Sequence, residues 1–286
     1  MHRLIALLLM LLFLPACAIA DFDFPGIFLE DGQAIIHTED TYRSQNLAIT
    51  LTSQRIEECD VYVADVYIRS LEQLQRYFAD DVWNKRADRM RTMAPESGAI
   101  LAITGDNSRL ISAGYVFGNG KLLRQTKNTK RDLCVIYKTG EMQVLTAGHI
   151  DHDLLLAQAD DIWHSFLFGP SLLDESGKAM TEFTSAVKVT NPRSAIGYYE
   201  PGHYCLVQVD GRGTQSALEE RHISTGMTLT QLSSLMESLG CKAAYNLDGG
   251  QSSMLWWDGD VLSTPYRGGR PLGDIIILTE PAAQAE

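Results

Sequence analysis

The sequence has few basic side chains and, after its first twenty residues, no long hydrophobic run. Its 286 residues include 24 Lys and Arg against 36 Asp and Glu, which gives a formal net charge of −12. Because such an acidic chain is repelled by phosphate backbones, we expect no general binding to nucleic acid. Since no later stretch approaches about 20 consecutive apolar residues, we also expect no membrane-spanning segment in the mature chain.

Cysteine is scarce as well, and no two cysteines have the C-x-x-C spacing that is typical of a zinc site. Four of the five cysteines lie beyond residue 20, namely Cys59, Cys134, Cys205 and Cys241. An even number in an exported chain permits two disulfides, whose connectivity the sequence leaves open. We favour Cys205 with Cys241 as a pair. Buried free thiols are the alternative interpretation, because Cys205 lies in an apolar run.

The first residues have the pattern of a secretory signal peptide. Arg3 precedes an apolar run at 4–14, which is too short to span a bilayer. Ala18-x-Ala20 then fits a small-residue cleavage site, so residues 1–20 are excluded from the predicted fold. We therefore expect a secreted or extracytoplasmic protein. Leu14-Pro-Ala-Cys17 also loosely resembles a lipoprotein box, so the alternative is a lipid anchor on Cys17.

The remaining sequence contains no tandem repeat and no Pro- or Ser-rich linker, which favours one domain. We divide it into an extended lead-in at 21–45, the domain at 46–280 and a disordered tail at 281–286. The predicted class is α+β, a single domain with a central mixed, strand-rich sheet and flanking helices. Alternating or continuous apolar runs predict strands at 47–52, 59–68, 98–105, 115–118, 134–137, 142–145, 204–210, 243–247 and 274–278.

Helical spacing of apolar residues predicts three helices, at 70–79, 151–158 and 228–239. The third is the clearest, because Thr228 and Gln231 form a capping box in front of a leucine stripe. The first rests on Leu71, Leu74 and Phe78, which would share one face of a helix.

The stretch 245–255 concentrates hydrogen-bonding groups at the exit of a buried strand. Gly249 and Gly250 allow positive φ angles and a close approach of the backbone to a ligand. The polar side chains of the stretch include Asn246, Asp248, Ser252 and Ser253. A strand followed by a tight turn is the alternative interpretation, because Asp-Gly-Gly is a common turn signal.

Three other short polar clusters accompany apolar strands. They are Asp106-Asn107 after Gly105, Asn191-Pro-Arg193, and Asp210-Gly-Arg212. Each cluster alone could be a turn that caps a strand. Their recurrence at the ends of apolar strands favours one shared ligand site.

In this order, and with a helix opening at Gly226-Met-Thr-Leu229 before the last of them, the four clusters resemble the phosphodiester glycosidase family. The resemblance covers roughly residues 46–280. Its most specific part is the block Asn246–Ser253, and Asn191-Pro-Arg193 and Phe168-Gly-Pro170 also match the family pattern. Family members usually have a third glycine where this chain has Gln251, which bears on specificity.

The resemblance implies hydrolysis of a sugar-1-phosphodiester, of the N-acetylglucosamine-1-phosphodiester kind, at the anomeric carbon. An oxocarbenium-like transition state needs a nearby carboxylate, so Asp106 and Asp248 are the expected catalytic residues. Because a phosphate monoester leaves readily, charge stabilisation matters more than a general acid. Arg193 suits that role, since a guanidinium can bind two phosphate oxygens, and Arg212 is the second choice.

The other candidates are expected to bind substrate. Side chains would hold sugar hydroxyls or phosphate at Asn107, Asn246, Ser252 and Ser253, backbone N–H groups would serve at Gly249 and Gly250, and Asn191 and Asp210 complete the set. No metal or cofactor is expected. Asp248 and Asp210 could hold a divalent cation, but neither histidines nor further acids cluster with them.

Two functions follow from the sequence, and it fixes neither the sugar nor the oligomeric state. The first is an exported phosphodiester glycosidase. The alternative is a non-catalytic surface protein that binds an anionic or phosphorylated polysaccharide in the same pocket. The presence of both Asp106 and Asp248 favours the enzyme, because a degenerate binding protein would be expected to have lost one of them.

Overall fold

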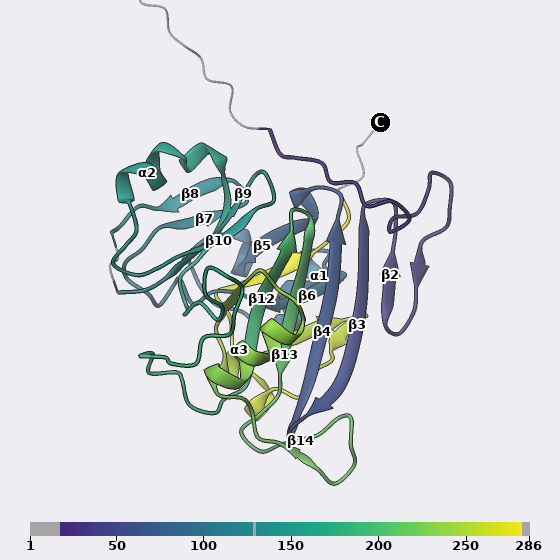
Figure 1. The fold of residues 1–286 in the computed structure, drawn as a ribbon. Helices are drawn as coiled ribbons and strands as arrows, with labels where there is room; N and C mark the ends of the chain where they lie inside the picture. The colour runs from purple at the N-terminus through teal and green to yellow at the C-terminus, as the bar shows by residue number, and fades with distance from the viewer. Residues whose placement is uncertain (1–17, 128–129, 282–286) are drawn as a thin grey trace, which may run out of the picture.

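The computed structural model describes residues 18–127 and 130–281 of the chain. The predicted signal sequence up to Cys17 and the tail from residue 282 lie outside these residues. Two sheets pack face to face, and one helix covers the outer face of each (Figure 1). Strands greatly exceed helices, so the predicted strand-rich character is confirmed. None of the helices in this part of the chain is long and apolar enough to cross a membrane.

The larger sheet has seven strands in the order β1-β2-β3-β4-β13-β12-β16. Their bounds are β1 (Ile36–His37), β2 (Thr41–Arg43), β3 (Leu47–Ile56), β4 (Cys59–Ile68), β12 (Arg193–Glu200), β13 (His203–Val209) and β16 (Ala243–Asn246). Because β2 pairs with β3 and β1 pairs with β2, part of the predicted lead-in extends this sheet. The strand β16, which leads to the polar turn at 248–253, lies at the opposite edge.

The smaller sheet has five strands in the order β18-β17-β6-β19-β5. Their bounds are β5 (Leu74–Phe78), β6 (Leu101–Thr104), β17 (Leu255–Trp257), β18 (Asp260–Val261) and β19 (Asp274–Leu278). Its inner face meets the larger sheet in one apolar core, where Ile103 and Ile276 pack with Ile49 and Leu206. Burial of this shared face is the main force that holds the two sheets together.

Helices cover the outer faces. The helix α3 (Leu229–Ser238) packs Leu232 and Met236 onto the larger sheet, and α1 (Met90–Glu96) packs onto the smaller one. In Figure 1, α3 lies in front of β12 and β13, whereas α1 and β6 lie behind them. The capping box of Thr228 and Gln231 is present, which confirms the predicted start of α3.

Beside the two sheets lies a third group of elements, drawn in teal in Figure 1. It comprises β7 (Val116–Gly118), β8 (Lys121–Arg124), β9 (Leu133–Tyr137), β10 (Met142–Leu145), α2 (His152–Ala157) and β11 (Ile162–Phe166). A separate hairpin joins β14 (Thr214–Gln215) to β15 (Ile223–Ser224). The strands predicted at 134–137 and 142–145 are confirmed as β9 and β10, which pair in an antiparallel ladder.

Three expectations are corrected by the fold. Every strand pairing among the described residues is antiparallel, so the central sheet is not mixed, and two sheets replace the single one. The helix predicted at 70–79 is wrong, because a 3-10 turn (Leu71–Gln73) is followed by β5. Leu74 and Phe78 are four residues apart and so share a face in either structure, and the buried Arg76 between them fits only the two-residue period of a strand. The short helix α1 was not predicted.

Candidate active site

The polar turn after β16 lies where the two sheets meet. Tyr245 and Leu247 anchor its approach in the core. The Asp248 N–H donates a hydrogen bond to Gly105 O at 3.2 Å, which places Asp248 beside the end of β6. Gly250 has a φ of 64°, a left-handed conformation that favours glycine, and its N–H donates to Pro192 O. Because that N–H is already used, the expected ligand contact from the Gly250 backbone is not available.

Two adjacent cavities open at this turn, and Asn107, Asp248 and Arg270 line both of them. The larger cavity has a volume of about 560 Å³, and its polar lining also includes Asn191, Arg193, Arg212, Gly249, Gly250 and Gln251. The smaller cavity has a volume of about 270 Å³, and its lining includes Thr104, Asp106, Arg109 and Asp274. Residues from all four sequence clusters, which span more than 140 positions of the chain, therefore surround one divided cleft.

Asp248 is held by an arginine that the sequence analysis missed. Arg270 Nη2 lies 2.9 Å from Asp248 Oδ2, and Arg270 Nε donates to Ser252 Oγ. Gln251 Nε2 donates to Gly269 O at 3.1 Å and so fastens the segment that carries Arg270. Nothing in the sequence marks Arg270, because it follows the turn by some twenty residues and lies in an irregular loop.

Asp106 is buried beside the smaller cavity, and both of its carboxylate oxygens accept backbone hydrogen bonds. Leu167 N–H donates to Oδ2 at 2.8 Å and Phe168 N–H donates to Oδ1 at 2.6 Å. Burial raises the pKa of Asp106 to about 7, with Asp274 adding to the rise and Arg76 opposing it. The structure thus brings Asp106 and Asp248 to one cavity, and it also gives Asp106 a positioning role.

The buried ion pair of Arg76 and Asp274 holds the backbone of Asp106 in place. Arg76 donates to Asp274 Oδ2 through Nε at 3.1 Å and Nη2 at 2.7 Å, and the Asp106 N–H donates to the same oxygen. Arg76 and Asp274 are almost fully buried. A Cβ on Gly105 would lie 2.5 Å from Asp274 Oδ2, so only glycine fits at the turn between β6 and Asp106. Neither Arg76 nor Asp274 was predicted to belong to the site.

Two cations without a carboxylate partner among the described residues line the larger cavity. Arg193 is 2% exposed, and its Nε and Nη2 donate to the carbonyls of Met227, Val187 and Val189. Arg212 donates twice to Asn191 Oδ1, at 3.1 Å and 2.8 Å. Burial, and then repulsion by Arg212, lowers the pKa of Arg193 to about 10, so it remains charged at neutral pH.

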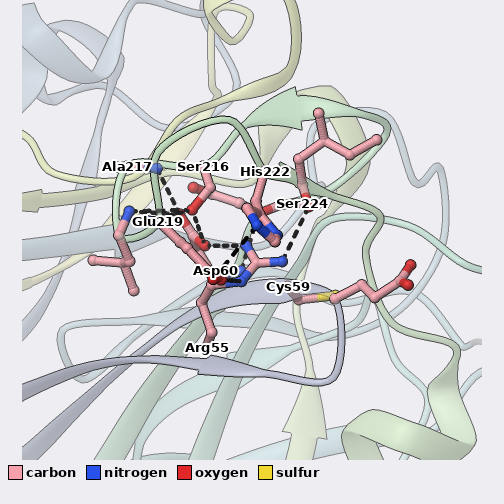
Figure 2. A network of polar contacts seen from close by, with 12 residues as sticks. Arg55, Cys59, Asp60, Ser216, Ala217, Glu219, His222 and Ser224 are labelled. Atoms are coloured by element: carbon pink, nitrogen blue, oxygen red, sulfur yellow. Dashed lines mark hydrogen bonds and ion pairs between the residues drawn. The ribbon is translucent and has the colours of Figure 1, made fainter.

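The buried carboxylate of Asp60 fastens the β14–β15 hairpin to the larger sheet (Figure 2). Arg212 lies at the base of this hairpin, where its N–H pairs with Thr225 O. Asp60 accepts hydrogen bonds from Arg55 Nη1, Ser216 Oγ and Ala217 N–H, each at 2.7 Å. Burial alone would raise the pKa of Asp60, but these hydrogen bonds outweigh it and hold the pKa below its ordinary value. The Arg212 N–H and the Gly213 N–H then pair with the returning strand of the hairpin, which fixes the backbone of Arg212.

Four residues that were expected to contact substrate lie outside both cavities. Asn246 is fully buried and donates through Nδ2 to Gly169 O at 2.8 Å. Ser253 is bonded to Ser194 and Gln208, and Ser252 accepts from Arg270. Asp210 is buried, its carboxylate accepts from Thr264 N–H at 2.7 Å, and burial raises its pKa to about 7. Asn246, Ser252 and Ser253 therefore hold the turn and the strand before it in place, whereas Asp210 holds the segment at Thr264.

The residues that the structure describes contain no group of three or more His, Cys, Asp or Glu side chains arranged to hold a metal ion. Asp248 and Asp210, the pair considered for a divalent cation, do not line a common cavity.

Comparison with known proteins finds relatives of this chain in sequence and in fold. A relative from Bacillus subtilis (strain 168), the SPbeta prophage-derived uncharacterized protein YomE, is 27% identical over 223 residues. That likeness covers 74% of this chain but 32% of the relative, so the chain spans about a third of that protein's length.

Two solved structures share the fold. The catalytic domain of zebrafish N-acetylglucosamine-1-phosphodiester alpha-N-acetylglucosaminidase, auto-inhibited by its pro-peptide, matches with a TM-score of 0.62 and 18% identity over 82% of this chain and 83% of that one. A hypothetical protein from Synechocystis matches with a TM-score of 0.61 and 14% identity over 86% of this chain and 64% of that one. The family pattern of phosphodiester glycosidases matches residues 96–279, well over half of the chain and the part that holds the cleft. The chain therefore belongs to the phosphodiester glycosidase family.

Proposed function

We propose that the protein is an exported hydrolase that cleaves sugar-1-phosphodiesters to a free sugar and a phosphomonoester. An N-acetylglucosamine-1-phosphodiester is the proposed kind of substrate, and membership of the family and the likeness to the zebrafish enzyme support it. The observation that carries the proposal is the placing of the Asp248 carboxylate beside Arg193 and Arg212 in one cavity.

The arginines support an anionic ligand. An ionised side chain as buried as Arg193 is costly unless an opposite charge faces it, and carbonyl oxygens compensate only in part. Burial lowers the pKa of Arg193, and repulsion by Arg212 adds to that effect, so Arg212 does not supply the opposite charge. A phosphodiester bound between them would supply the missing negative charge, and guanidinium groups match phosphate oxygens well.

The division of the cleft supports one orientation of the substrate. The phosphate would lie in the larger cavity with Arg193 and Arg212, and the sugar would lie in the smaller one. Carboxylate and amide groups of that smaller cavity, such as Asn107, are suited to sugar hydroxyls. Asp248 lines both cavities, so the bond between sugar and phosphate would lie next to its carboxylate.

In this arrangement Asp248 stabilises the positive charge that develops at the anomeric carbon, while Arg270 fixes the direction of its carboxylate. The bond between the anomeric carbon and the phosphate oxygen breaks, and the electron pair leaves with the phosphate. Arg193 and Arg212 stabilise that leaving charge. A water molecule supplies the new hydroxyl of the sugar and loses one proton to solvent.

A direct test is release of free N-acetylglucosamine from an N-acetylglucosamine-1-phosphodiester by the purified protein. We expect Asp248→Asn to lower kcat/KM by at least about 100-fold, as is typical for loss of one electrostatic stabiliser. Asp160→Asn, an exposed carboxylate outside both cavities, is the matched control and should leave the rate unchanged. The enzymatic proposal fails for this substrate if the wild type releases no more sugar than an Asp106→Asn, Asp248→Asn double variant.

The hydrogen bonds of Asp106 favour a second candidate function, a non-catalytic binding protein. Both oxygens of Asp106 are occupied by backbone N–H groups, so Asp248 is the more available of the two predicted catalytic carboxylates. A binding protein for phosphorylated polysaccharide would hold the same diester in the larger cavity and return it unchanged. Titration calorimetry that shows binding of the diester, together with no sugar release over hours, would favour this alternative.

Export and independence from metal are part of the same proposal. N-terminal analysis of the protein purified from the outer compartment of an expressing bacterium should find Asp21 as the first residue, and a lipid on Cys17 would instead show the anchored alternative. Dialysis against EDTA should leave both the rate of sugar release and the melting temperature unchanged. A loss that Ca²⁺ or Mg²⁺ restores would show that a cation belongs to the site.

A further inference from the structure

Two buried cysteines meet on the outer side of the larger sheet, close to the start of the strand that leads to Asp248. Cys205 lies on β13, and Cys241 lies in the connection between α3 and β16. Their Sγ atoms are 3.5 Å apart, and both side chains are buried. In the structure they are free thiols, whereas a disulfide requires an S–S distance of about 2.05 Å. Formation of the bond would require the sulfurs to move about 1.5 Å closer together.

The sequence makes room for this meeting at Gly197. This glycine lies on β12, directly opposite Cys205 in the ladder between β12 and β13. A Cβ on Gly197 would lie 2.6 Å from Cys205 Sγ and 2.6 Å from Cys241 Sγ. Real Cβ atoms do not approach other atoms so closely, so any larger residue would push the two sulfurs out of the space that they share. Because Gly197 has no side chain, Cys205 from the neighbouring strand β13 and Cys241 from the residues before β16 can touch each other across β12.

The other two described cysteines have different surroundings. Cys59 Sγ accepts a hydrogen bond from Gly226 N–H at 3.2 Å, at the base of the hairpin that carries Arg212. Cys134 lies on β9 within the apolar core, where burial raises its pKa. Among the contacts of the described residues, Cys205 and Cys241 form the one close approach of two sulfurs.

We propose that Cys205 and Cys241 are the site of an intramolecular disulfide that forms when the protein folds in an oxidising compartment. The bond would tie the middle of the larger sheet to the residues that open β16. The two cysteines are 36 positions apart in the chain, and the residues between them include all of α3, so the bond would close a loop that contains this helix. The proposal concerns a covalent modification and does not depend on the proposed hydrolase activity.

The chemistry requires a disulfide-bearing oxidant, such as a thiol–disulfide oxidoreductase of the outer compartment. The thiolate of one of the two cysteines attacks a sulfur of the oxidant, forms a mixed disulfide and displaces one thiolate of the oxidant. The other cysteine then loses its proton and attacks the sulfur of the first, which releases the second oxidant thiolate. Two protein thiols are thus oxidised to a disulfide while one oxidant disulfide is reduced to a dithiol. Both sulfurs are buried after folding, so the exchange must precede final packing.

Peptide mapping of the exported protein tests the proposal. The protein is secreted in a host that forms disulfides, denatured in the presence of an alkylating agent without reductant, and digested. We expect a cross-linked peptide pair that contains Cys205 and Cys241, with Cys59 and Cys134 alkylated. Recovery of both Cys205 and Cys241 in alkylated form, or of a link to Cys59 or Cys134, would overturn the proposal.

Variants and melting temperatures provide the controls. Cys59→Ser should retain the cross-link, whereas Cys205→Ser should make Cys241 fully alkylated after denaturation. Reduction should lower the melting temperature of the wild type by about 5–10 °C, because a loop of this length stabilises a folded domain by constraining the unfolded chain. The melting temperature of Cys205→Ser should not respond to reductant, even if this variant starts lower. An equal response in the wild type and Cys205→Ser would contradict the assignment.

Discussion

Asp106 and Asn246 lie at the ends of strands in different sheets, and both bind the same segment of the chain. Asp106 accepts hydrogen bonds from the N–H groups of Leu167 and Phe168, and Asn246 donates to the next carbonyl, Gly169 O, at 2.8 Å. Phe168 lines the larger cavity. Asp106 and Asn246, which were both predicted site residues, therefore hold residues 167–169 in place, and this segment forms part of the cleft lining.

Arg270→Lys should impair catalysis more than substrate binding. The guanidinium bonds Asp248 through Nη2 and Ser252 through Nε at the same time, and a lysine cannot reproduce that fork. A carboxylate displaced by about 1 Å can cost about 100-fold in rate, so kcat should fall by roughly that factor. Steady-state kinetics with the sugar phosphodiester provides the measurement. A variant with unchanged kcat would show that Arg270 does not position Asp248.

Asp60→Asn should weaken substrate binding through Arg212. The substitution removes the negative charge of the carboxylate that accepts hydrogen bonds from Arg55, Ser216 and Ala217. The hairpin that carries Arg212 is then held less firmly on the sheet. We expect KM to rise several-fold with a smaller change in kcat, and the free energy of unfolding to fall by about 1–3 kcal/mol. Glu220→Gln, an exposed change on the same hairpin, is the control. Equal losses in kcat and in kcat/KM would point instead to a role in the chemical step.

Gln251→Gly introduces the third glycine that the resemblance to the family predicts at this position. The Gln251 side chain bonds Gly269 O and lines the larger cavity, next to the segment that carries Arg270. We expect the variant to accept bulkier groups beyond the phosphate, which would appear as a lower KM for such diesters relative to the wild type. If KM values for small and bulky diesters change in parallel, Gln251 does not determine specificity.

Asp210 should make the protein less stable as the pH rises towards neutrality. Burial, reinforced by Asp60, raises the pKa of Asp210 to about 7 from an ordinary value of 3.8. The folded state therefore binds more protons than the unfolded state between these two values, and the free energy of unfolding falls as the pH increases from about 4 to about 7. Asp210→Asn should remove this part of the pH dependence, at most about 4 kcal/mol. Urea unfolding at several pH values compares the two proteins, and identical slopes would contradict the assignment.

Much of the cleft lining could be predicted because polar residues that follow apolar strands mark the ends of a sheet. Asn107, Asn191, Arg193, Arg212 and Asp248 all line the larger cavity, as their positions beside strands suggested. The strand at 98–105 and the helix at 228–239 were evident for the same reason, since burial imposes a clear period on both.

The remaining features depend on contacts between distant segments. The inward orientation of Asn246 and Ser253 follows from the way the turn packs against Gly169 and Gln208, which local sequence does not encode. Arg270 and Asp274 are conspicuous only once β19 is seen beside β6. A buried arginine such as Arg76 also runs against the expectation that charged residues face solvent, and it obscured the strand β5.

Asp106 follows the smaller sheet and Asp248 follows the larger, so the separation of the two carboxylates depends on how thick the apolar layer between the sheets is. Leu247 and Leu255 flank the polar turn and belong to that layer. Substitution of either leucine by a smaller residue would reduce the distance between the two sheets. The separation of the two carboxylates would then change, although neither leucine lines the cleft. Substrate preference in such a protein can therefore evolve through its interior, by substitutions that a comparison of cleft residues alone would overlook.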